Sequence, residues 1–185
     1  MRQVREHIFE TNSSSTHSVS IRGNKHPVYT CTLHEYLDKN DHKLHMKFGE
    51  FGWGYDEYED DYNKLQYLLT MIAEVHKNDY YHPDFTSLEE YYMLDDFLLL
   101  ESIVCDHIKE CKGIVIESTI KDRSYSNVTD KDGNPCHMID IEGYIDHQSC
   151  EDYYCLNDFL DDWDLTIEKF LFNDNVELII DSDNS

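Results

Sequence analysis

The chain has 185 residues, of which 39 are acidic and 15 basic, for a formal net charge of −24. A hydrophobic fraction of 40%, with 14 tyrosines and 8 phenylalanines, can build a core, which excludes a disordered chain. The charge excludes strong binding to free nucleic acid, whose affinity for proteins comes largely from Lys and Arg. It favours a strongly basic protein surface as the partner, although a solvated acidic surface without a partner fits the charge as well.

The cysteines and the standard cofactor motifs narrow the class of protein further. The 6 cysteines show no CxxC pair and no metal-finger spacing. The chain also lacks a P-loop, a dinucleotide fingerprint, an HExxH motif and a nucleophile elbow. No signal peptide or transmembrane run is found. We therefore expect a reduced, cytosolic protein with free thiols, no cofactor, no metal and no membrane association.

The first 25 residues predict two strands around a polar run. Residues 3–10 read as a short strand, and residues 17–22 alternate as a second strand that stops at Gly23. Between them, residues 10–18 carry hydroxyl, amide, carboxylate and imidazole groups without a glycine, which is atypical of a flexible linker. If the strands pair, residues 1–25 form a hairpin on which Glu10 and His17 face each other across the polar loop.

Residues 56–112 predict a helical hairpin. The first helix runs to about Lys77, with an apolar stripe of Leu65, Leu68, Leu69 and Ile72. The second starts near Thr86 with a capping box and runs to about Cys111, where Gly113 ends it. His76 and His107 lie on these stripes and are interpreted as histidines at the edge of the core.

The rest of the chain adds short elements that do not alternate as βαβ units. The expected elements are a strand at 43–48, a strand from Ile114, a hairpin turn at Asp132–Gly133 with a return strand at 137–144, helices at 156–163 and 166–172, and a final strand at 176–180. We therefore predict a single α+β domain over residues 1–185, in which a mixed or antiparallel sheet of about six strands packs with two long helices.

Two polar groups of residues can carry chemistry. The first comprises Arg5, Glu10, Asn12, Ser13, Ser14, Ser15, Thr16 and His17; the second comprises Asp146, His147, Gln148 and Ser149. Each sets an imidazole beside a carboxylate and hydrogen-bond donors, an arrangement that can move protons at neutral pH. The alternative is that the Ser/Thr run only caps a turn, as these residue types do in many proteins.

Metal-independent cleavage of a phosphodiester is the reaction that these groups favour. We expect acid and base roles for Glu10 and His17, with His147 as the other candidate. The expected phosphate-binding residues are Arg5, Asn12, Ser13, Ser14, Ser15, Thr16 and Gln148. In RNA, the base would take the proton of the ribose hydroxyl that attacks phosphorus, and the acid would protonate the departing oxygen.

The N-terminal stretch Arg2-x-x-Arg5-x-x-Ile8 to Ser18 resembles a signature of small proteins carried by phages and mobile elements of Gram-positive bacteria. Shorter matches to that family lie at residues 49–53, 144–149 and 170–173. Proteins with this N-terminus include anti-CRISPR inhibitors of type II-A effectors. The resemblance implies cleavage of the guide RNA while the effector holds it. The partner would then be a type II CRISPR effector nuclease with its guide RNA, and binding to free nucleic acid would be weak or absent.

A non-enzymatic inhibitor remains the alternative function. In that case the acidic surface mimics a nucleic-acid backbone and blocks the loading of guide or target DNA onto the basic channel of the effector. A third alternative is a phage protein of another role whose Ser/Thr run is only a turn. Stoichiometry separates the first two, because an enzyme can inhibit below one molecule per effector and a mimic cannot.

Overall fold

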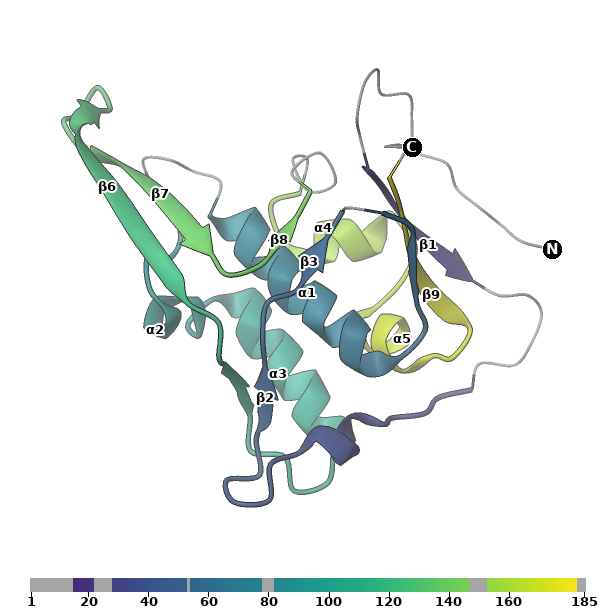
Figure 1. The fold of residues 1–185 in the computed structure, drawn as a ribbon. Helices are drawn as coiled ribbons and strands as arrows, with labels where there is room; N and C mark the ends of the chain where they lie inside the picture. Colours follow the sequence, from purple (N-terminus) through teal and green to yellow (C-terminus); the bar gives the residue numbers. More distant parts are fainter. Residues whose placement is uncertain (1–14, 22–27, 53, 78–81, 147–152, 183–185) are drawn as a thin grey trace.

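The computed structural model describes residues 15–21, 28–52, 54–77, 82–146 and 153–182 (Figure 1). Its central element is the helix α1 (Asp61–His76), which begins after Asp60, whose carboxylate accepts a hydrogen bond from the Asn63 amide. The predicted stripe of α1 is buried, but so are Tyr67 and Met71 on other faces of the helix. A helix that is buried on nearly all sides belongs to the interior of a domain, and the other elements surround α1.

A three-stranded antiparallel sheet covers one side of α1. Its order is β1 (Ser15–Ile21), β9 (Val176–Ser182) and β4 (Asp56–Tyr58). Val19 of β1 and Leu178 of β9 are paired in register and both are buried. The strand expected at 17–22 therefore exists but begins at Ser15, within the stretch expected to be a loop. Its described partner is the C-terminal strand; residues 3–10 lie outside the described residues.

The remaining strands form three separate pairs rather than one sheet of six strands. β2 (Leu44–Met46) pairs in parallel with β5 (Ile114–Ile116), and β3 (Glu50–Phe51) pairs in parallel with β8 (Tyr144–Ile145). The third pair is the hairpin of β6 (Ile120–Thr129) and β7 (Pro135–Ile141). The expectation of a single sheet was wrong: four of these strands have only two or three residues, and the longer β6 and β7 pair only with each other among the described strands.

The β6–β7 hairpin extends away from the helices (Figure 1). Its turn is organised by Asp130, whose carboxylate accepts hydrogen bonds from the Asp132 and Asn134 amides. Gly133 has a φ of 87°, in the left-handed region that glycine tolerates best. The turn predicted at Asp132–Gly133 is therefore confirmed, and β6 reaches to Thr129.

The helix expected from Thr86 to Cys111 is two helices, α2 (Leu88–Tyr91) and α3 (Asp95–His107). No glycine or proline lies at the break between the two helices, so we attribute the break to tertiary packing. The hydroxyl of buried Tyr91 donates to the carbonyl of Leu69, and that of Tyr92 accepts from the Ile116 amide. The two tyrosines are thus anchored at the end of α2, Tyr92 keeps helical dihedral angles, and the backbone becomes extended at Leu94.

The short C-terminal helices confirm the prediction: α4 is Leu156–Asp161 and α5 is Ile167–Phe172. A 3₁₀ helix, η1 (Leu33–Tyr36), follows Thr32, which donates from its amide and its hydroxyl to Asp61 at the start of α1. The result is a mixed α+β domain, as the sequence predicts, built from small sheets around α1.

Candidate functional site

Strand β1 places His17 on the inner face of its sheet. Side chains alternate along a strand, so His17 lies on the same face as Val19, which is buried. Its cross-strand neighbour in β9 is Ile180, another core residue. The register with β9 thus directs a half-buried imidazole toward α1.

Tyr67 of α1 meets this imidazole. The Tyr67 hydroxyl and Nδ1 of His17 lie 2.9 Å apart, within hydrogen-bond distance. The Tyr67 ring is fully buried and is packed edge-on against Phe51, with ring centroids 5.0 Å apart. Since the ring of Tyr67 is fixed by its neighbours, its hydroxyl holds His17 in one orientation.

Asp146 is the third residue of this site. It follows β8, and its amide donates to the carbonyl of Phe51 at 3.0 Å. Burial lowers the pKa of His17 from 6.5 to about 4, and the charge of Asp146 opposes this shift. The imidazole is therefore neutral at neutral pH, and we call His17, Tyr67 and Asp146 the His17 corner.

The His17 corner brings together one member of each polar group singled out in the sequence. His17 belongs to the first group and Asp146 to the second, although 129 positions separate them in the sequence. Ser15 and Thr16 lie in β1, where they pair with Ser182 and Asp181. The other predicted site residues lie outside the described residues: Arg5, Glu10, Asn12, Ser13, Ser14, His147 and Gln148.

Tyr67 is the residue of this corner that the sequence did not single out. It sits within the apolar stretch of α1, one position before Leu68, and a tyrosine there reads as core. Its hydroxyl contacts His17 of β1 and its ring packs against Phe51 of β3, both distant from it in the sequence. No local sequence pattern indicates that these segments lie side by side in the fold.

His76, at the C-terminal end of α1, is a histidine held by carboxylates. Its Nδ1 lies 2.6 Å from Asp84 and its Nε2 lies 3.0 Å from Asp96. Hydrogen bonds to Asp96 and Asp84 raise the pKa of His76 against the effect of burial. Asp96 also accepts from the Leu156 amide at 2.7 Å, so this cluster joins α1, α3 and α4. Its role is structural, because two carboxylates that raise the pKa of the imidazole link it to neighbouring elements.

His107 is at the edge of the core, as predicted. Its ring stacks on Phe172 with centroids 4.3 Å apart, and its Nε2 lies 3.1 Å from a Glu168 oxygen. Within the described ranges, no group of three or more His, Cys, Asp or Glu side chains is arranged to hold a metal ion. Nor is any helix of the described part long and apolar enough to cross a membrane.

Comparison with known proteins adds no relative. A scan against protein-family models, a search of curated proteins and a search of solved structures each found no match.

Proposed function

We propose that this chain inhibits a type II RNA-guided nuclease by cutting its guide RNA, with His17 as the proton acceptor. The observation that carries the proposal is the neutral imidazole of His17, oriented by Tyr67 next to Asp146. The resemblance of residues 2–18 to anti-CRISPR proteins supports the same reading. The enzyme is an endonuclease of the host cytoplasm that uses no metal.

The proposed mechanism assigns each nitrogen of His17 a role. In the tautomer in which Nδ1–H donates to the Tyr67 hydroxyl oxygen, Nε2 carries the lone pair that accepts the ribose hydroxyl proton. A neutral imidazole needs no prior deprotonation for this step. A phosphate next to the ring raises its pKa, because a nearby anion favours the imidazolium, and so makes it a better base as the substrate binds.

The acid must be a different group, because an imidazole with a pKa of about 4 is neutral at neutral pH, and a neutral imidazole is too weak an acid to protonate the departing oxygen. Glu10 and His147 are the candidates; His147 directly follows Asp146 in the chain. Arg5, Gln148 and the residues from Asn12 to Thr16 supply the donors that would stabilise charge on the phosphoryl oxygens. The ribose oxygen attacks phosphorus, and the departing oxygen takes its proton from the acid.

The test is a cleavage assay on guide RNA bound to the effector, with free guide RNA in parallel. His17→Ala should slow cleavage at least about 100-fold, the effect typical of losing a general base. The matched control is His34→Ala, because His34 is exposed and its ring bonds only locally, to the carbonyl of Cys31. Unchanged cleavage by His17→Ala would remove His17 from the mechanism.

The charge supports the non-enzymatic inhibitor as a second candidate. With 39 acidic against 15 basic residues, the chain can present a polyanionic surface to a basic nucleic-acid channel. A titration of effector activity decides between the two. Inhibition that saturates only at one molecule per effector, with intact guide RNA, favours the mimic.

A further inference from the structure

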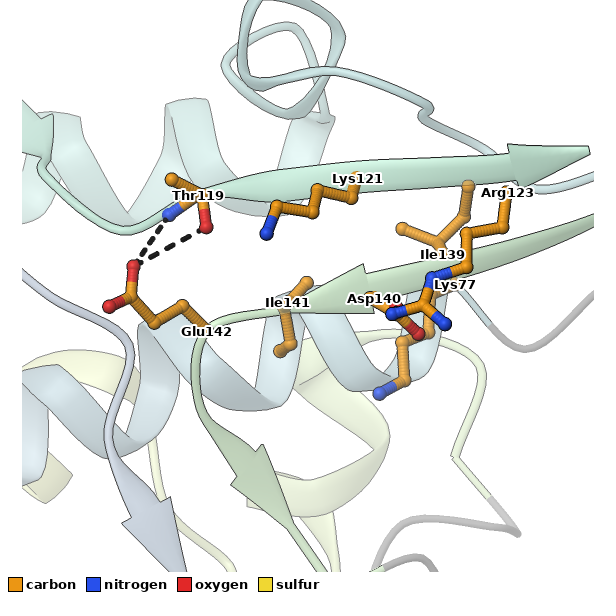
Figure 2. A pocket seen from close by; sticks show the side chains of 8 residues that line it. All are labelled: Lys77, Thr119, Lys121, Arg123, Ile139, Asp140, Ile141 and Glu142. Atoms are coloured by element: carbon orange, nitrogen blue, oxygen red, sulfur yellow. Dashed lines mark hydrogen bonds and ion pairs between the residues drawn. The ribbon is translucent and has the colours of Figure 1, made fainter.

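A groove of about 580 Å³ lies between the β6–β7 hairpin and the C-terminal end of α1 (Figure 2). Its volume is within the range of small-molecule sites, roughly 300–1,000 Å³. The polar residues that line it are Lys77, Thr119, Lys121, Arg123, Asp140 and Glu142. Three cations in one groove are unusual on a chain with a net charge of −24.

The three cations of the groove differ in whether a carboxylate already pairs with them. Lys121 is exposed and takes part in no ion pair among the described residues. Arg123 lies 2.6 Å from Asp140, yet a guanidinium has five N–H donors and this pair uses only part of them. Lys77 lies 2.7 Å from Glu74. Lys121 and Arg123 extend from the same strand and line the same groove (Figure 2), so a ligand that fills the groove can meet both.

The two carboxylates of the groove restrict the ligand. Asp140 pairs with Arg123, and Glu142 accepts hydrogen bonds from the amide and hydroxyl of Thr119. A ligand that is anionic throughout meets repulsion from both. A ligand that joins one phosphate to a group with N–H donors fits both halves, because carboxylates accept hydrogen bonds from the amino groups of bases.

We propose that this groove binds the phosphate of a nucleotide, either free or within an RNA strand. Lys121 and Arg123 hold the phosphate, and Glu142 faces the base. The −24 charge keeps the affinity for free RNA weak overall, but at about 0.15 M salt charges beyond about 8 Å are screened, so local cations decide binding here. The groove is separate from the His17 corner, and the proposal does not depend on RNA cleavage.

Three probes separate the possible sources of the phosphate: a labelled single-stranded RNA of about a dozen nucleotides, adenosine monophosphate and inorganic phosphate. Binding is measured by fluorescence anisotropy for the RNA and by calorimetry for the others, at about 0.15 M salt. RNA binding without adenosine monophosphate binding assigns the groove to a strand, and binding of both assigns it to a nucleotide unit. Inorganic phosphate as tight as adenosine monophosphate contradicts the role of Glu142.

The decisive variant is Lys121→Gln with Arg123→Gln, which we expect to weaken binding about tenfold or more. The matched control is Lys109→Gln with Lys169→Gln, two exposed lysines outside the groove that change the net charge equally. Equal losses in both pairs would show a general charge effect and overturn the site. The absence of binding of all three probes to the unmodified chain would also overturn it.

A variant that is expected to bind more tightly adds a test in which misfolding cannot imitate the expected result. Asp140→Asn removes a negative charge and releases Arg123 from its ion pair, so this variant should bind the RNA or nucleotide several-fold more tightly. Its control is Asp106→Asn, an exposed carboxylate on α3. Equal affinity of Asp140→Asn and Asp106→Asn would contradict the proposal.

Discussion

His17 contacts Tyr67 of α1 and His76 lies at the C-terminal end of α1, yet their pKa values move in opposite directions. Burial lowers the pKa of His17 to about 4, and the charge of Asp146 only partly opposes it. Hydrogen bonds to Asp96 and Asp84 raise the pKa of His76. Near neutral pH the first histidine is neutral, whereas the surroundings of the second favour its charged form more than water does.

The difference follows from the number and placement of the carboxylates. An imidazole that bonds an oxygen of a carboxylate at each nitrogen gains more from its charge than burial costs. An imidazole that bonds a tyrosine hydroxyl gains little from being charged. His76 is thereby a structural link, and His17 is a histidine that can accept a proton. The predictions below separate these roles.

The largest expected effect is on stability, from His76→Ala. The variant leaves buried Asp96 without its histidine partner, which typically costs about 3–5 kcal/mol. Denaturant unfolding at pH 6 measures it, with His34→Ala as the control, for which a change below about 1 kcal/mol is expected. Because the pKa of His76 is raised, its contribution is complete below about pH 6.5 and declines as the pH rises through the folded-state value. Equal losses for both variants would contradict a charged link.

The next effect is the pH dependence contributed by His17. A folded-state pKa of about 4 against 6.5 means that the unfolded chain binds a proton that the folded one rejects. Stability should therefore fall as the pH is lowered from 6.5 to 4, by about 3 kcal/mol from this group. The measurement is the free energy of unfolding of wild type minus that of His17→Gln across this range. A difference that does not change with pH contradicts a half-buried imidazole that is kept neutral by its surroundings.

A smaller effect is expected from Tyr67→Phe, which keeps the packed ring and removes the hydroxyl. Losing one hydrogen bond costs about 1 kcal/mol. If Tyr67 positions His17 for catalysis, the cleavage rate should fall more than stability explains, and the dependence of that rate on pH should change. Tyr91→Phe is the matched control, because its hydroxyl bonds a backbone carbonyl away from this corner.

The smallest effect is expected from Asp146→Asn. The carboxylate of Asp146 raises the pKa of His17, so its removal should lower that pKa further. At neutral pH the imidazole is already neutral, and stability there should change little through this interaction. A rise in the pKa of His17 in this variant would mean that Asp146 acts on it otherwise than by charge.

The parts of the fold set by short-range signals could be predicted from the sequence. The hairpin turn at Asp132–Gly133, the helices α4 and α5, and the strand β9 follow from turn residues and local patterns. The break between α2 and α3 could not, because the hydrogen bonds of Tyr91 and Tyr92 to distant backbone override local helix propensity.

The residues of the candidate site could likewise be predicted only in part from the sequence. His17 and Asp146 could be singled out because each is a charged or polar side chain at the end of a predicted strand. Their meeting could not be predicted, because it depends on β1 pairing with the C-terminal strand and on β3 pairing with β8. Tyr67 could not be chosen over the other buried tyrosines without that pairing.

The most direct test of the account is an NMR titration of the histidine ring protons in the folded chain, assigned with His17→Gln and His76→Gln. The account predicts that the His17 ring titrates near pH 4 and the His76 ring above pH 6.5. A His17 ring that titrates at an ordinary 6.5 would contradict the account, because the imidazole would then be neither buried nor held neutral by its surroundings.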